Sequence, residues 1–181
     1  MQLVAIEPPG NVARDIALYR RRLFSALGEG SALAFPDILP LAFASPGTKL
    51  SRAGLEGCWQ GVDGRLAATG PLLSGGLLYL SVEGPLRSLS SRVEALLDAQ
   101  SGRQDRAAPA PLEAGIGFFL CRSAEPEVAL REALSLEPPG LSFLDCALVV
   151  LRLRYGPDPF MAQTWRELAR AKRRTGPSRD V

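Results

Sequence analysis

The stretch "FPDILPLAFAS", Phe35 to Ser45, predicts a β-strand from Ile38 to Ala44 with Pro40 in its middle. A proline has no backbone N–H group to donate to a neighbouring strand, so it is excluded from the centre of a sheet. The strand is therefore expected either to lie at the edge of its sheet or to bulge at Pro40.

A complete strand–helix–strand unit surrounds this stretch. "QLVAIEP", Gln2 to Pro8, predicts a strand that stops at two prolines and a glycine. Apolar residues then recur every three or four positions, which is typical of an amphipathic helix that begins after an N-cap at Asn11 and ends at Gly28. The first unit covers residues 2–44.

The same order of elements is found again in the middle of the chain. "GLLYLSV", Gly76 to Val82, predicts a strand, and the apolar spacing from Leu86 to Leu97 predicts a helix. After a polar linker, Ser101 to Pro111, "GIGFFLC" from Gly115 to Cys121 predicts another strand. The second unit covers residues 76–121, and we interpret the repeat as an internal duplication.

The remaining pattern completes an α+β prediction. We expect these further elements: a strand at Arg65–Leu73, a helix at Glu127–Leu136, a strand at Leu144–Arg154 and a helix at Phe160–Lys172. The predicted fold is one bilobal domain over residues 1–181. It has two pseudo-symmetric lobes, with mostly antiparallel sheets that flank a central groove and with the helices outside.

Composition excludes several kinds of chemistry. The chain of 181 residues contains no histidine, so imidazole is excluded as a general base and as a metal ligand. Three cysteines, Cys58, Cys121 and Cys146, form no C-x-x-C pair and are interpreted as small buried hydrophobes. We therefore expect no metal and no cofactor.

The same composition bears on cellular location. No apolar run reaches the roughly 20 residues that a membrane span requires. We expect a cytoplasmic protein without a membrane partner.

Three blocks of sequence resemble a known family: "LVAIEPPGNVARDIALYRRRL", "GGLLYLSVEGPLRSLSSRVEALL" and "GIGFFLCRS". In order and spacing, from Leu3 to about Leu168, they are similar to the two-histidine phosphoesterases, which include the bacterial 2′-5′ RNA ligases and cyclic phosphodiesterases. The resemblance implies two His-x-Thr/Ser-x motifs, one on a strand of each lobe. In such a pair one imidazole accepts a proton and the other donates one, while the hydroxyl groups hold phosphate oxygens.

All four of these motif positions are occupied by other residues here. The resemblance aligns Ile38 and Pro40 with the first histidine and threonine, and Gly117 and Phe119 with the second pair. It thus implies a catalytically inactive relative that acts as a binding or regulatory module. Two alternatives stay open: a phosphoesterase of altered chemistry that uses other groups in the same cleft, and a structural subunit.

Two kinds of ligand are compatible with this pattern. An RNA end or nucleotide could be bound by arginines that follow the second motif or lie at the end of a predicted strand, which are Arg122, Arg152 and Arg154. It would also use the basic C-terminal segment, residues 164–181, whose candidate contacts are Arg166, Arg170, Lys172, Arg173 and Arg174. These cations also fit a solvated helix end. In contrast, an apolar groove floor of Ile38, Pro40 and Phe119 favours a hydrophobic ligand or a protein partner.

Overall fold

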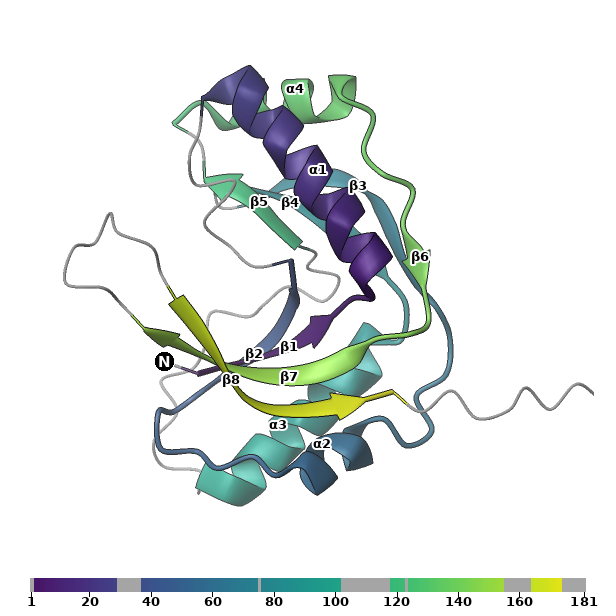
Figure 1. The fold of residues 1–181 in the computed structure, drawn as a ribbon, viewed down its shortest axis with the longest axis vertical. Helices are drawn as coiled ribbons and strands as arrows, with labels where there is room; N and C mark the ends of the chain where they lie inside the picture. Colours follow the sequence, from purple (N-terminus) through teal and green to yellow (C-terminus); the bar gives the residue numbers. More distant parts are fainter. Residues whose placement is uncertain are drawn as a thin grey trace, which may run out of the picture.

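The computed structural model describes residues 2–28, 37–74, 76–101, 118–122, 124–154 and 164–173. These residues form two antiparallel four-stranded sheets with helices packed around them (Figure 1). In the first sheet the order is β2-β1-β7-β8, with strands β1 Gln2–Glu7, β2 Leu39–Ala44, β7 Ala147–Arg154 and β8 Thr164–Lys172. In the second it is β5-β4-β3-β6, with strands β3 Leu66–Ser74, β4 Leu77–Glu83, β5 Phe118–Arg122 and β6 Ser142–Phe143. The α+β prediction with antiparallel sheets is confirmed.

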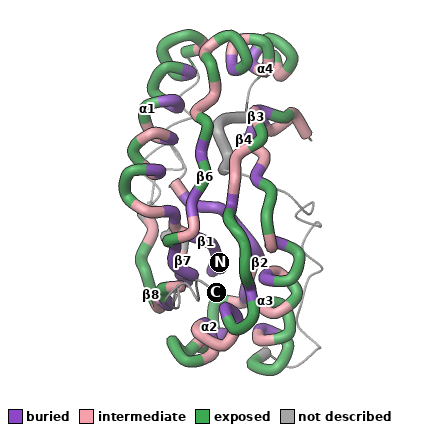
Figure 2. Tube along the Cα trace, turned by 90° about the vertical axis from the view of Figure 1, so that its right-hand side faces the viewer, coloured by how far each residue is buried: buried purple, intermediate pink, exposed green. Residues whose placement is uncertain are grey.

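The helices are α1 Gly10–Leu27, α2 Arg52–Cys58, α3 Leu86–Ser101 and α4 Pro126–Ser135. Two of these four helices, α1 and α3, lie with the sheet to which their preceding strand does not belong, whereas α2 and α4 pack on the sheet of the strand they follow (Figure 1). α1 follows β1 of the first sheet but lies beside α4 at the end of the molecule that holds the second sheet (Figures 1 and 2). Conversely, α3 follows β4 of the second sheet but packs against β2 and α2. One continuous apolar core joins both sheets and all four of these helices.

The two antiparallel strand pairs of the predicted units, β1–β2 and β4–β5, have the same kind of register shift. β1 pairs with β2 so that Leu41 has no partner, between the pairs Val4–Ala42 and Ala5–Pro40. β4 pairs with β5 so that Leu120 has no partner, between the pairs Leu78–Cys121 and Tyr79–Phe119. A constant offset of 74 positions relates the first strands (Val4 to Leu78) and one of 79 relates the second strands (Leu41 to Leu120). Both β2 and β5 are edge strands.

The C-terminal helix predicted at Phe160–Lys172 is wrong, because Thr164–Lys172 is strand β8, paired with β7. A bulge explains the error. Ala169 pairs with Val150 and Glu167 pairs with Leu151, which leaves Leu168 unpaired. The extra residue interrupts the alternation of inward and outward side chains by which a strand is identified in a sequence. Residues 160–163 lie outside the described residues.

Other differences are local. The helix predicted after an Asn11 cap begins two residues earlier, at Gly10, and its N-cap is Pro9. The predicted end at Gly28 is confirmed by a left-handed backbone with φ of 69°. α2 was not predicted, because Gly54 and Gly57 weaken its helical pattern. Ser51 caps it by accepting a hydrogen bond from the backbone N–H of Gly54.

The turn between β4 and α3 provides a test of the fold. Gly84 has a φ of 140°, and a Cβ atom there would lie 2.6 Å from the carbonyl oxygen of Arg65. We expect Gly84→Ala to lower the free energy of unfolding by about 2 kcal/mol or more, since the side chain meets both strain and a backbone clash. Gly57→Ala in α2 is the control, because nothing lies within 4 Å of its Cβ position. Equal urea denaturation midpoints for the two variants would contradict the turn geometry.

Candidate functional site

The two strands that carry the predicted motif positions approach each other. β2 and β5 are edge strands of different sheets, and they contact each other (Figure 1). Pro40 lies in β2, Ile38 directly precedes that strand, and Phe119 lies in β5. Gly117 lies outside the described residues. The structure therefore places three of the four motif positions on or next to neighbouring edge strands.

The prediction that Pro40 marks an edge strand or a bulge is confirmed in both respects. β2 pairs only with β1 within the described sheet, and the register shifts beside Pro40. Pro40 is nevertheless buried. An edge strand tolerates a proline more readily than a central strand does, because only one of its sides is paired in the sheet.

Ile38 lies on a face of the first sheet that is lined by apolar side chains. We call this face the motif face; its buried members are Leu3, Ala5, Ile38, Ala147, Val149 and Leu151. Phe43 and Trp165 pack against it at its margins. Pro40 shares this face because it is the register partner of Ala5. The buried centre of the motif face therefore presents neither a hydroxyl group for a phosphate nor an acid or base for proton transfer.

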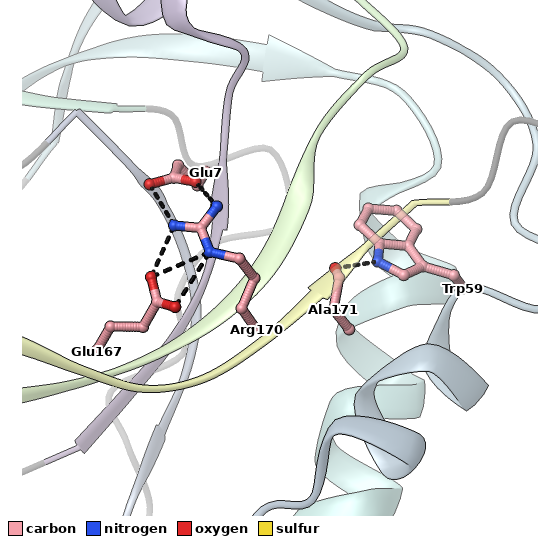
Figure 3. Close-up of polar contacts among 5 residues, drawn as sticks. All are labelled: Glu7, Trp59, Glu167, Arg170 and Ala171. Carbon is pink, nitrogen blue, oxygen red and sulfur yellow. Dashed lines mark hydrogen bonds and ion pairs between the residues drawn. The ribbon is translucent and has the colours of Figure 1, made fainter.

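Charged groups border this face at the end of β1 and along β8. Glu7, Glu167 and Arg170 are register partners or strand neighbours of its apolar members. Arg170 donates to both carboxylates of Glu7 and Glu167, with Nη2 at 2.9 Å from Oε1 of Glu7 and 2.7 Å from Oε2 of Glu167 (Figure 3). Hydrogen bonds to Glu167 and to Glu7 raise the pKa of Arg170. Its guanidinium group is thus already engaged with two carboxylates.

Arg173 is also engaged within the protein. It donates to the carbonyl oxygens of Val62 at 2.7 Å and Gly64 at 2.9 Å, and its guanidinium group lies 5.4 Å from the ring centroid of Trp59. The indole N–H of Trp59 donates in turn to the carbonyl oxygen of Ala171 (Figure 3). These contacts line a cavity of about 490 Å³. Arg173 fixes the loop after α2 to the end of β8.

The basic segment is therefore divided between exposed and engaged cations. Arg166 and Lys172 are exposed on β8, whereas Arg170 and Arg173 make the internal contacts above. The expected solvated helix end is wrong for the described part of the segment, because these residues belong to β8 or directly follow it. Arg174 lies outside the described residues.

Of the three predicted ligand-binding arginines, the structure describes the side chain of Arg152 alone, and that side chain does not lie on the motif face. Arg152 pairs in register with Gln2 and thus points to the opposite face of the sheet. There its Nη2 and the Nε2 of Gln2 both donate to the carbonyl oxygen of Pro46. Arg122 ends β5 and Arg154 ends β7, and their side chains lie outside the described residues.

A buried ion pair next to the motif was not predicted. Arg20 of α1 is 2% exposed, and its Nη1 lies 3.0 Å from Oδ1 of Asp37, the residue before Ile38. Burial lowers the pKa of Arg20 and raises that of Asp37, and the attraction between the two charges acts in the opposite direction on each. The pair joins α1 to the start of the motif strand. Its one sequence signal is that Arg20 falls within the apolar stripe of the helix, next to Tyr19.

The buried cysteines behave as the sequence predicts. Cys58 and Cys146 are buried free thiols. Burial raises the pKa of Cys146 to about 11, although the nearby guanidinium group of Arg173 favours the thiolate. Burial likewise raises the pKa of Cys58, against the opposing charge of Arg92. Neither thiol is activated as a nucleophile. The side chain of Cys121 lies outside the described residues.

Comparisons with known proteins do not identify a family. No family model matches the chain, and no curated protein is similar to it. Among the described residues, no three His, Cys, Asp or Glu side chains gather as metal ligands. The described helices also include none that is both long and apolar enough to cross a bilayer.

The Arg20–Asp37 pair yields a stability prediction. Asp37→Ala leaves a buried guanidinium group without its carboxylate, so we expect the free energy of unfolding to fall by about 2 kcal/mol. Adding Arg20→Met to Asp37→Ala should restore part of that loss, because it removes a buried charge that has lost the carboxylate of Asp37. Glu56→Ala, which breaks the exposed Arg52–Glu56 pair, is the control and should cost less than about 1 kcal/mol. Urea titration measures each value; a double variant less stable than Asp37→Ala would contradict the pairing.

Cys146 yields a prediction for alkaline pH. The folded protein retains the thiol proton up to about pH 11, whereas the unfolded chain releases it near the ordinary value of 9.0. Stability should therefore fall by roughly 2 kcal/mol as the pH rises from 9 to 11. In Cys146→Ala this component should be missing. Urea titrations of both proteins between pH 9 and pH 11 measure the free energy of unfolding. An identical dependence of this free energy on pH in the two proteins would show that the thiol is not protected by burial.

Proposed function

We propose that this protein is a catalytically inactive relative of the two-histidine phosphoesterases that acts as a binding or regulatory module. The supporting observation is the matched pair of strand–helix–strand units. In each unit the second strand is an edge strand, and it bulges at the same place relative to the motif positions, at Leu41 and at Leu120. A bulge aligned in two units is typical of a duplicated ancestor, since bulges are retained as features of a fold.

The arrangement of helices is also compatible with duplication. α1 and α3 occupy corresponding places in the two units, and each lies with the sheet of the other unit (Figure 1). Such an exchange gives two pseudo-symmetric lobes whose motif strands meet at the centre. In this proposal a central groove lies between β2 and β5, as in the enzymes of that family.

Loss of catalysis follows from the residues at the motif positions. The chain has no histidine, and Ile38 and Pro40 lie in an apolar surround. A phosphate brought against that surround would lose its hydration without gaining hydrogen bonds. We therefore favour a protein partner or apolar ligand at this site over an RNA end or nucleotide. The internal engagement of Arg170, Arg173 and Arg152 supports this preference.

A second candidate function, a phosphoesterase of altered chemistry, has one specific observation in its favour. Glu7 and Glu167 are two carboxylates on the motif side of the first sheet, and one guanidinium group, that of Arg170, bridges them. Carboxylates can act as general acid and base. The bridge itself argues against this role, because it holds both carboxylates in a charge-paired state.

The test is an assay with 2′,3′-cyclic nucleotides and with RNA that carries a cyclic phosphate end. We expect no hydrolysis above a control without protein and no saturable, salt-dependent binding of either substrate. Hydrolysis that persists through purification and disappears in Glu7→Gln or Arg170→Ala would establish the altered-chemistry candidate. Hydrolysis unaffected by both variants would refute the inactive assignment altogether, whereas tight binding without turnover would assign the module to RNA ends.

A further inference from the structure

The outer face of α1 carries three arginines around an exposed leucine. Arg14, Arg21 and Arg22 are exposed, and Leu18 between them is 50% exposed. With 3.6 residues per turn, all three arginines lie within about 60° of Leu18 around the helix axis. Exposed residues follow the outer side of α1 in Figure 2. We call Arg14, Leu18, Arg21 and Arg22 the basic face of α1.

The cations of this face are available to a partner. None of the three arginines forms an ion pair or side-chain hydrogen bond with a residue that the structure describes. This differs from Arg170 and Arg173, whose guanidinium groups are engaged inside the molecule. Asp15, partly buried, is the carboxylate at the margin of the same helix face. The charge extends for about 12 Å along the helix, the rise of eight residues.

Leu18 determines which partner fits best. A phosphate backbone would pair with the arginines but would leave the leucine in water. An anionic membrane surface would require a wider apolar face, but the apolar stripe of α1, including Val12, Ile16 and Leu23, is already buried in the core. An acidic peptide that also carries apolar side chains would satisfy both features. Its carboxylates match the planar guanidinium groups, and one of its apolar residues covers Leu18.

We propose that the basic face of α1 binds an acidic segment of another protein, in which carboxylates flank an apolar side chain. An apolar contact surrounded by charged pairs is the usual composition of a protein interface, with the charges steering association. The basic face lies on the outside of α1 and does not involve the motif face. The proposal that it binds a partner therefore does not depend on the proposed groove.

The probe is a synthetic, fluorescein-labelled peptide made of glutamates with a leucine at every fourth position. Fluorescence anisotropy measures its binding to the full chain in low salt. We expect the triple variant R14Q/R21Q/R22Q to weaken binding by roughly tenfold, and Leu18→Ser to weaken it by roughly threefold or more. Circular dichroism of each variant verifies that α1 stays folded; all four positions are exposed, so the core is not altered.

The matched control removes the same charge elsewhere. K49Q/R52Q/R87Q neutralises three exposed cations outside α1, and its affinity should stay within about twofold of the wild type. An equal loss of affinity in this control would show that binding depends only on the net charge of the protein, and it would overturn the proposal. So would absence of measurable peptide binding. Tight binding of a single-stranded oligouridylate that depends on the three arginines but not on Leu18 would assign the face to nucleic acid instead.

Discussion

The central strand β1 is buried on both of its faces, and the arrangement of the other elements depends on this burial. Val4 and Ile6 point into the main core, which α2 and α3 help to cover, whereas Leu3 and Ala5 point into the motif face. A strand without a polar side must have apolar layers above and below it. β2 and β7, the strands on either side of β1, are likewise apolar on both faces, whereas β8 at the edge of the sheet carries mostly exposed or half-buried residues.

This double burial also explains why the motif positions suit packing better than catalysis. Ile38 contributes to the same apolar cluster as Leu3 and Val149. A histidine or threonine at that place would have to be desolvated and would need partners for its polar atoms. Ile38 and Pro40 carry no polar side-chain atoms, so they are favourable in this apolar cluster. Under the proposed function, Ile38 and Pro40 in place of a histidine and a threonine avoid burying polar groups in this cluster.

Charge is used in two distinct ways. Arg20, Arg170 and Arg173 are structural: they hold α1, β8 and the loop after α2 to their neighbours by ion pairs or by bonds to carbonyl oxygens. The arginines on the outside of α1 make no such contacts with described residues. The number of basic residues in the C-terminal segment therefore overstates how many of its cations can bind an anion, because Arg170 and Arg173 are engaged within the protein. Whether a guanidinium group is available depends on its position relative to carboxylates and carbonyl groups.

The amino-acid sequence by itself determined the local elements with strong patterns, namely the strands around Pro40 and Tyr79 and the helices that end at Gly28 and Ser101. It also excluded histidine chemistry outright. Only the tertiary structure decided that residues 164–172 form a strand and that Arg20 meets Asp37. The physical reason is that period and composition are local properties. Hydrogen-bond partners across a sheet and ion pairs between distant segments depend instead on which parts of the chain are brought together.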